Sequence, residues 1–113
     1  QIEDDIYVMD AAGKNDSKVT TTGNNRHPDW SPDGSLIVFA SHRNEQAEIF
    51  TIQPDGESEE RLTVSDGENH RHPTWESEGD RIAFIKGGEI FIMDANGEHD
   101  FQVFPYTTLF RSK

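Results

Sequence analysis

The chain has 113 residues, of which 32% are hydrophobic and 28% are charged, and its formal net charge is -12 at pH 7. This acidity argues against nucleic-acid binding, because affinity for phosphate backbones comes from clustered Lys and Arg. No apolar run approaches the ~18 residues that a membrane-spanning helix needs, and the absence of cysteine excludes disulfide bonds and cysteine-ligated metal.

The first predicted elements are two strands joined by a tight turn. Residues 5–10 are rich in Ile, Tyr and Val and alternate weakly, which favours a strand. Asp10-Ala11-Ala12-Gly13 then has Asp at the first and Gly at the fourth position of a type I turn, the usual core of a tight hairpin. Lys18-Val19-Thr20-Thr21 is short and half polar, as expected of an outer strand with a blunted edge.

A proline-tryptophan motif opens the next unit of the chain. Arg26-His27-Pro28 leads to Trp30 and then to the turn Ser31-Pro32-Asp33-Gly34. Because proline has no N–H, we expect a strand to begin at Pro28, where the missing donor costs least. The following segment, Leu36-Ile37-Val38-Phe39-Ala40, is apolar at both odd and even positions, which point to opposite faces of a strand, so both faces of this strand must be covered.

The same motif returns 45 residues later as Arg71-His72-Pro73-Thr74-Trp75-Glu76-Ser77-Glu78-Gly79. The second copy keeps the turn glycine but lacks the proline of the first turn. Ile82-Ala83-Phe84-Ile85 repeats the strand that is apolar on both faces, and Lys86-Gly87-Gly88-Glu89 predicts a two-residue hairpin. An internal period of this length indicates stacked copies of one supersecondary unit.

A second series of segments runs out of phase with the first. Each begins with Ile and an aromatic residue and leads to a glycine: Ile6-Tyr7 to Gly13, Ile49-Phe50 to Gly56 and Ile90-Phe91 to Gly97. Turn signals fall every 8 to 12 residues, and no window shows a helical apolar stripe. The sequence therefore predicts an all-β fold: a β-propeller fragment of about two and a half four-stranded antiparallel blades.

The pattern also resembles a known repeat family. Pro28-x-Trp30-Ser31-Pro32-Asp33-Gly34-x-x-Ile37-x-Phe39, followed by Glu48-Ile49-Phe50-Thr51-Ile52, Asp55-Gly56 and Arg61-Leu62-Thr63, closely resembles the WD40-like (PD40) repeat of TolB-type β-propellers. The resemblance spans residues 5–103. It implies one partial propeller over residues 1–103, with half a blade at 5–20, a full blade at 28–63 and a partial blade at 73–103.

The C-terminal segment is predicted to be foreign to the repeat. Phe104-Pro105-Tyr106-Thr107-Thr108-Leu109-Phe110-Arg111-Ser112 resembles the translation of a common sequencing adapter, and it stands where a repeat should finish its last strand. We therefore interpret residues 104–113 as a non-native tail and exclude them from fold reasoning. On this interpretation the chain is a truncated metagenomic read whose gene continues past residue 103.

The candidate binding residues are the basic side chains ahead of each Pro-x-Trp motif: Arg26, His27, His70, Arg71 and His72. In propellers the first strand of each blade lines the central channel, so the resemblance places these residues near one mouth of that channel. One interpretation is a repeated basic rim that receives acidic or polar groups of a protein partner. The other is that each His or Arg bonds a neighbouring blade and cements the ring.

The remaining motif residues are interpreted as structural: Pro28, Trp30, Gly34, Pro73, Trp75 and Gly79. The fixed place of the tryptophans in each repeat favours packing between blades over ligand stacking. The segment from Asp94 to Asp100 resembles a calcium loop but lacks the distant glutamate, and its place in the repeat predicts a hairpin turn. With no H-E-x-x-H, G-x-S-x-G or phosphate loop, no metal site, cofactor or catalytic residue is predicted.

The function implied by the resemblance is a non-catalytic, protein-binding module of the bacterial cell envelope. A TolB-like protein is periplasmic and takes part in the Tol-Pal system by binding the lipoprotein Pal; neither nucleic acid nor a membrane span is implied. Two alternatives stay open. The propeller could precede the catalytic domain of a prolyl-oligopeptidase-like serine peptidase, or it could be a structural part of an OmpA-like surface protein.

Overall fold

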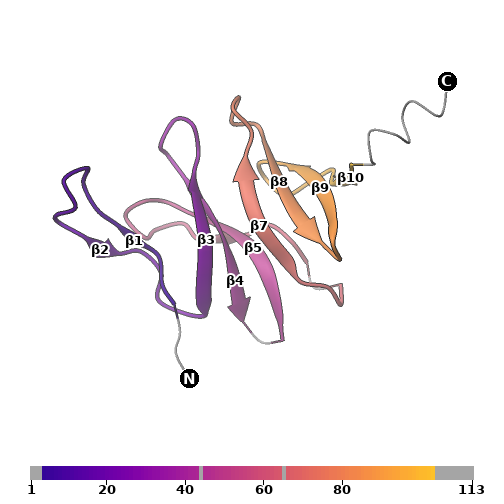
Figure 1. Cartoon of the computed structure of the whole chain (residues 1–113), viewed down its shortest axis with the longest axis horizontal. Helices are drawn as coiled ribbons and strands as arrows, with labels where there is room; N and C mark the ends of the chain where they lie inside the picture. The colour runs from indigo at the N-terminus through magenta and orange to yellow at the C-terminus, as the bar shows by residue number, and fades with distance from the viewer. Residues whose placement is uncertain (1–3, 44, 65, 104–113) are drawn as a thin grey trace.

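The computed structural model describes residues 4–43, 45–64 and 66–103, and all the regular elements of these residues are β-strands (Figure 1). The strands form three antiparallel sheets, which follow one another from the N-terminal hairpin to the C-terminal sheet. The predicted fold class, all-β with two and a half blades of a propeller, is confirmed. The predicted non-native tail, residues 104–113, lies outside the described residues.

The first sheet is a hairpin of β1 (Tyr7–Val8) and β2 (Ser17–Lys18). The second has the order β3-β4-β5-β6, with strands Asn24–Trp30, Ile37–Arg43, Gln46–Ile52 and Glu60–Arg61. The third has the order β10-β9-β8-β7, with β7 at His70–Trp75, β8 at Arg81–Lys86, β9 at Glu89–Asp94 and β10 at Phe101–Gln102. The part of the chain that the structure describes contains no helix able to cross a membrane.

The predicted hairpin turns are present in all three units. Each is closed by a bond from the glycine N–H to the carbonyl oxygen three residues earlier: Gly13 to Asp10, Gly56 to Gln53 and Gly97 to Asp94. A Cβ on Gly97, whose φ is 90°, would lie 2.5 Å from the carbonyl oxygen of Leu62. Only glycine therefore lets this turn rest on the backbone of the preceding sheet.

The two-residue link between β8 and β9 is also as predicted. Lys86 pairs directly with Glu89, and the intervening Gly87 and Gly88 have φ angles of 59° and 81°. Positive φ at both central residues is the requirement of a type I′ turn, which matches the twist of the flanking strands.

Strand β4 is the centre of the core because both of its faces are buried. Ile37 and Phe39 pack with residues of the first hairpin, while Val38 and Ala40 on the opposite face pack with residues of the third sheet. Val38 and Phe39 have no exposed surface. Full burial of such a side chain contributes about 1.5–3 kcal/mol. The predicted covering of both faces of this strand is confirmed.

Strand β8 differs from β4 in the covering of its second face. Ile82 and Phe84 are buried against the second sheet, but Ala83 is half-buried and Ile85 is 38% exposed. No sheet of the described residues packs on this outer face. Ile90 and Phe101 are also about half exposed, at 52% and 48%. The third sheet therefore presents an apolar outer face in this chain.

The prediction that a strand begins at Pro28 was wrong. Strand β3 begins four residues earlier, and Pro28 lies at a β-bulge, where the pairing with β4 shifts between Arg26 and Asp29. A bulge leaves residues out of the ladder, so no N–H is needed from the proline. Strand β7 has the same irregularity at Pro73.

The two tryptophans occupy different surroundings. Trp75 is 8% exposed; its backbone N–H donates to Asp29 Oδ2 at 2.9 Å, and its indole N–H donates to the Asp29 carbonyl oxygen at 3.1 Å. Packing between blades is thus observed for Trp75. Trp30 is 48% exposed. Strand β7 packs beside β3, the first strand of the preceding unit, but among the described residues no first strand of a preceding unit packs beside β3.

A matched pair of substitutions tests this difference. Trp75→Phe should lower the free energy of unfolding by about 1–3 kcal/mol, since it removes a buried hydrogen bond and part of a packed ring. Trp30→Phe should change it by less than about 0.5 kcal/mol. Urea unfolding followed by far-UV circular dichroism measures both, and equal losses would contradict the assignment of Trp75 as the inter-blade anchor.

The apolar outer face of the third sheet predicts self-association of the 113-residue chain, because repeats depend on their neighbours for burial. Sedimentation velocity should show concentration-dependent oligomers, and Ile85→Thr combined with Phe101→Thr should reduce them. Val64→Thr is the control, since Val64 is 69% exposed but lines a hollow with Phe84 and Met93 of the inner face. A monomeric chain with a cooperative melt above roughly 60 °C would contradict the prediction.

Candidate functional site

Two histidines project from the β-bulges of the first strands. His27 and His72 have φ angles of 58° and 53°, in the left-handed region that few residues other than glycine adopt. Each stands directly before the proline of its bulge, within the segment where pairing to the next strand is shifted. A bulge re-aims a side chain relative to a regular ladder. The repeat therefore sets both imidazoles in the same unusual backbone conformation.

The two imidazoles meet although they are 45 positions apart in the chain. Strand β7 lies beside β3, and the rings of His27 and His72 stack with their centroids 4.0 Å apart and their planes at 25°. Both side chains are exposed. Neighbouring units thus build one continuous surface from their equivalent residues.

The stacked histidines form part of the walls of two hollows. One hollow, of about 260 Å³, is lined in addition by Asn24, Arg26, Ala40, His42, Ala47 and Arg71. The other, of about 280 Å³, is lined in addition by Pro28, Asp29, Pro73 and Thr74. The structure therefore brings four of the five predicted binding residues together, and it adds His42 to them.

The arginines beside the histidines differ in their partners. Arg26 Nε lies 2.9 Å from Asp4 Oδ2 in an exposed ion pair. For Arg71, none of the described carboxylates comes within 4.0 Å. We refer to Arg26, His27, Arg71 and His72 together as the Arg–His rim. Its positive charge is only partly neutralised from within the described chain.

The electrostatic surroundings of His27 reflect this positive charge. Burial lowers the pKa of His27 below its ordinary value of 6.5, and the nearby charges of His72, Arg26 and Arg71 lower it further. A proton added to His27 therefore meets a positive potential. An anion placed at the rim would relieve that repulsion.

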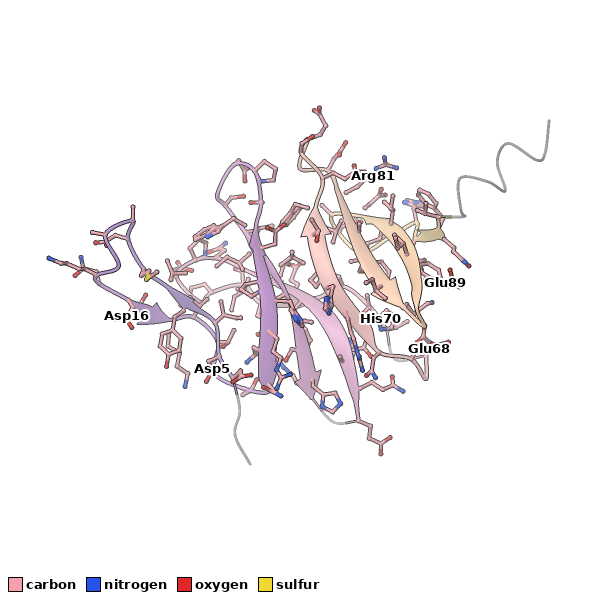
Figure 2. The ribbon with its side chains drawn as sticks, viewed as in Figure 1. Asp5, Asp16, Glu68, His70, Arg81 and Glu89 are labelled. Carbon is pink, nitrogen blue, oxygen red and sulfur yellow. The ribbon has the colours of Figure 1, made fainter. Side chains whose placement is uncertain are left out.

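His70 lies away from the rim. It is 3% exposed, with Nδ1 3.1 Å from Glu48 Oε1 and Nε2 3.6 Å from Asp66 Oδ2. Figure 2 shows it at the start of β7, at the opposite end of the sheet from Arg81. Its contact with Glu48 joins the third sheet to the second. Among the predicted binding residues, His70 thus fits the alternative interpretation, in which the side chain contacts a neighbouring blade and joins the two.

The residue before Arg26 in the first copy has a similar position. Asn25 is 1% exposed, and its side-chain amide donates to Asp5 Oδ1 at 3.2 Å and to the Thr22 carbonyl oxygen at 2.9 Å. Asn25 and His70 both face an acidic residue of the preceding unit. This position therefore connects units in both copies, with a different side chain in each.

The acidic partners belong to a buried link that our sequence reasoning missed. The Thr63 hydroxyl donates to Glu48 and accepts the N–H of Ile49 at 3.0 Å. In the first unit, the Thr20 hydroxyl donates to Asp5 at 2.8 Å in the same way. The recurrence of a threonine at a spacing of 43 residues was the available signal. A buried hydroxyl with both partners satisfied fixes the outer strand of each unit.

The turn glycines of the motif behave as predicted. Gly34 and Gly79 have φ angles of 76° and 85°, and their N–H groups donate to the carbonyl oxygens of Ser31 and Glu76, both at 2.9 Å. The second turn therefore forms without the proline that precedes the first glycine by two residues. The glycine conformation, rather than a preset proline, is common to the two copies.

The segment that resembles a calcium loop is a hairpin turn, as predicted. The Asp94 N–H donates to the Glu98 carbonyl oxygen at 2.9 Å, and His99 Nδ1 lies 2.7 Å from Asp94 Oδ2. This hydrogen bond and the charge of Asp94 raise the pKa of His99. Within the described ranges, no three His, Cys, Asp or Glu side chains are grouped so that they could hold a metal ion.

The positive potential at the rim predicts how the pKa of His27 responds to substitution. Arg71→Gln should raise this pKa toward 6.5, because one of the three positive charges near His27 that lower it is removed. Because the pKa of His27 is lower in the folded than in the unfolded protein, the unfolded state binds more protons between these two pKa values, and the free energy of unfolding rises with pH in that interval. Arg71→Gln brings the two pKa values closer together, so this rise should become smaller. NMR titration of the imidazole carbons measures the pKa directly. Arg61→Gln is the control; an equal effect of both changes would contradict the account.

Comparison with known proteins places this geometry in context. The family model for the TolB beta propeller domain matches residues 1–107. The Tol-Pal system protein TolB of Geobacter sulfurreducens is 39% identical over 63 residues, and an uncharacterized protein of Agrobacterium fabrum is 44% identical over 62 residues. These matches cover 56% and 54% of the chain, but only 15% and 21% of those proteins.

Solved structures show the same fold. A protein of Agrobacterium tumefaciens provisionally named TolB has a TM-score of 0.82 and 31% identity, over 88% of this chain and 40% of that one. TolB from Acinetobacter baumannii has a TM-score of 0.75 and 21% identity, over 90% of this chain and 27% of that one. The tricorn protease, with a TM-score of 0.65 and 22% identity, shares the fold over 83% of this chain and 9% of its own.

Proposed function

The chain belongs to the TolB β-propeller domain family, and on this premise we propose that it is part of a non-catalytic propeller that binds another protein in the bacterial cell envelope. The observation that carries the proposal is the Arg–His rim: equivalent basic residues of two successive units gather on one surface of the first strands. A surface repeated from unit to unit suits recognition of a partner at the mouth of a ring.

The ring itself is proposed to continue beyond the described units. The outer face of β8 and the ring of Trp30 are exposed here, while their counterparts Val38, Ala40 and Trp75 are buried between sheets. Further blades on both sides would cover them in the same way. This proposal agrees with the fraction of its structural relatives that the chain spans, 40% and 27%. Residues 1–103 would then be one partial propeller, and residues 104–113 a non-native tail.

The partner class follows from the Geobacter sulfurreducens relative, which is named as a protein of the Tol-Pal system. We propose by analogy a peptidoglycan-associated lipoprotein of the Pal type as the partner and an extracytoplasmic, periplasmic location. The positive charge of the rim complements acidic groups of a partner, and such complementarity favours orientation of the partner at this surface.

The absence of turnover is part of the proposal. Propellers occur in enzymes, as the tricorn protease and an oligogalacturonate lyase in complex with manganese show, but their identities of 22% and 16% extend the likeness to the fold alone. In the described residues, the rim pairs His with His and Arg, and no nucleophile is hydrogen-bonded to a histidine base there. A hydroxyl or thiol nucleophile of the Ser–His or Cys–His type is activated by such a pair.

The test uses the complete protein encoded by the source gene. Calorimetric titration with the Pal-type lipoprotein of the same organism should show one-to-one binding, and Arg71→Glu should weaken it at least about tenfold, because a charge reversal at an interface opposes acidic partner groups. Arg61→Glu, on the outer strand β6, is the matched control and should bind as the wild type does.

Two results would contradict the proposed function. The first is a G-x-S-x-G domain downstream in the same reading frame together with peptidase activity, which would make the propeller part of an enzyme. The second is retention of full partner affinity in the Arg71→Glu variant, which would place the binding surface elsewhere.

A further inference from the structure

We propose that the stacked pair His27 and His72, with Arg71, is a proton-linked receptor for carboxylate groups in an acidic peptide segment. The inference rests on the proposed function and names the chemical group that the rim recognises. It differs from a general basic surface in two respects: the ligand group is a carboxylate, and its binding is coupled to uptake of protons by the imidazoles.

The first argument is the local excess of positive charge. The chain has 22 acidic and 10 basic residues, so carboxylates are abundant. Other cations of the described residues have acidic partners, including Lys18, Arg43 and Arg81. Arg71 is exposed and has no described carboxylate within 4.0 Å, although it lines the same hollow as both histidines. The rim therefore offers guanidinium and imidazole donors for an anion supplied from outside.

The second argument is the geometry of the stack. Two neutral imidazoles can stack at 4.0 Å, whereas two imidazolium ions at that distance repel each other. A carboxylate that accepts hydrogen bonds at the edge of the stack would offset the repulsion and stabilise the protonated rings. Binding should then take up protons, and the affinity should rise as the pH falls through the pKa values of the bound histidines.

The other charged groups around the stack do not remove this coupling. On β3, Arg26 is paired with Asp4, and the Asp29 carboxylate accepts the Trp75 N–H. On β4, His42 lines the hollow and adds a third imidazole, while β5 contributes only Ala47 to its wall. Burial, and then the positive neighbours, lower the pKa of His27 below 6.5 in the free protein. An anion would act against that lowering.

The same geometry disfavours a metal ion shared by the two histidines. The ring planes are inclined by only 25° with their centroids 4.0 Å apart, so the nitrogen lone pairs of the two rings lie in nearly parallel planes. A bound metal needs ligand lone pairs that converge, and structural and catalytic zinc sites use three or four protein ligands. No such group of three is found in the residues the structure describes.

The size and the overall charge favour a peptide over a polyanion. A hollow of about 260 Å³ is below the usual range of small-molecule sites, roughly 300–1,000 Å³, and suits one or two short acidic side chains. Its lining includes Ala40 and Ala47, which can contact the aliphatic part of a peptide. A long polyuronate or nucleic acid would bring many charges toward a chain of net charge -12, which repels them.

The test is isothermal titration calorimetry of the 113-residue chain with two blocked peptides, Ac-Ala-Glu-Asp-Glu-Ala-NH₂ and its uncharged analogue Ac-Ala-Gln-Asn-Gln-Ala-NH₂. The acidic peptide should bind about tenfold more tightly at pH 5.5 than at pH 7.5, since each linked proton changes affinity up to tenfold per pH unit. Titrations in two buffers of different ionisation enthalpy should show net proton uptake at pH 6.5. The uncharged analogue should not bind.

The key variant is His72→Asn, because asparagine tolerates the left-handed backbone at this position. It should weaken binding of the acidic peptide at pH 5.5 about tenfold and reduce the proton uptake. His99→Asn is the matched control: His99 is exposed and has a φ of 57°, but it lies at the Asp94 turn outside the rim. Circular dichroism verifies that both variants fold.

Four results would overturn the inference: affinity independent of pH, equal binding of the uncharged analogue, wild-type affinity in His72→Asn, or tighter binding of zinc alone or of trigalacturonate than of the peptide. These outcomes leave the proposed function intact, because capture of a lipoprotein by the complete protein is measured separately. Conversely, if the acidic peptide binds but the complete protein does not bind the lipoprotein, the proposed partner is contradicted while the proposed carboxylate receptor stands.

Discussion

The burial of both faces of strand β4 is the constraint on which the rest of the structure depends. A strand that is apolar on both parities leaves one face in water unless a second sheet covers it. Here the first hairpin covers Ile37 and Phe39, and the third sheet covers Val38 and Ala40. Each unit is therefore completed by its neighbours, and the units stack in chain order (Figure 1).

Polar contacts fix how one unit sits on the next. Both the backbone and the indole N–H of Trp75 donate to Asp29, which sets β7 against β3. At the far end of β7, His70 contacts Glu48, which also accepts the Thr63 hydroxyl. Non-directional apolar burial alone would not determine this register. Because contacts fix both ends of β7, the bulges of β3 and β7 lie side by side and the imidazoles of His27 and His72 stack. The functional surface is thus a consequence of the same contacts that join the units.

The sequence predicted what is local or periodic. The repeat spacing indicated the sheets, and the turn glycines Gly13, Gly56 and Gly97 indicated the hairpins, because a left-handed turn residue is a local requirement. The burial of β4 also followed, since its apolar pattern has no helical alternative. Each of these conclusions needs only the identity of residues close together in the chain.

What the sequence did not predict depends on neighbours in space. Pro28 was expected at a strand start, but the bulge around it lets the strand begin at Asn24. Trp30 and Trp75 are equivalent in the pattern, yet among the described residues only Trp75 has the first strand of a preceding unit beside it. His70 was grouped with the rim, although His70 and Arg71 are successive residues of the regular ladder, where side chains alternate between faces, whereas His72 lies in the bulge.

The central claim is that stacking of the units brings His27 and His72 face to face, and a disulfide tests it most directly because the chain contains no cysteine. The double variant His27→Cys with His72→Cys should form an intramolecular disulfide under mild oxidation. A disulfide requires the Cβ atoms of its two cysteines to lie about 3.5–4.5 Å apart, so it forms only between neighbouring positions. His27→Cys with His99→Cys should not. Failure of the first pair to cross-link in a chain that circular dichroism shows to be folded would contradict the account.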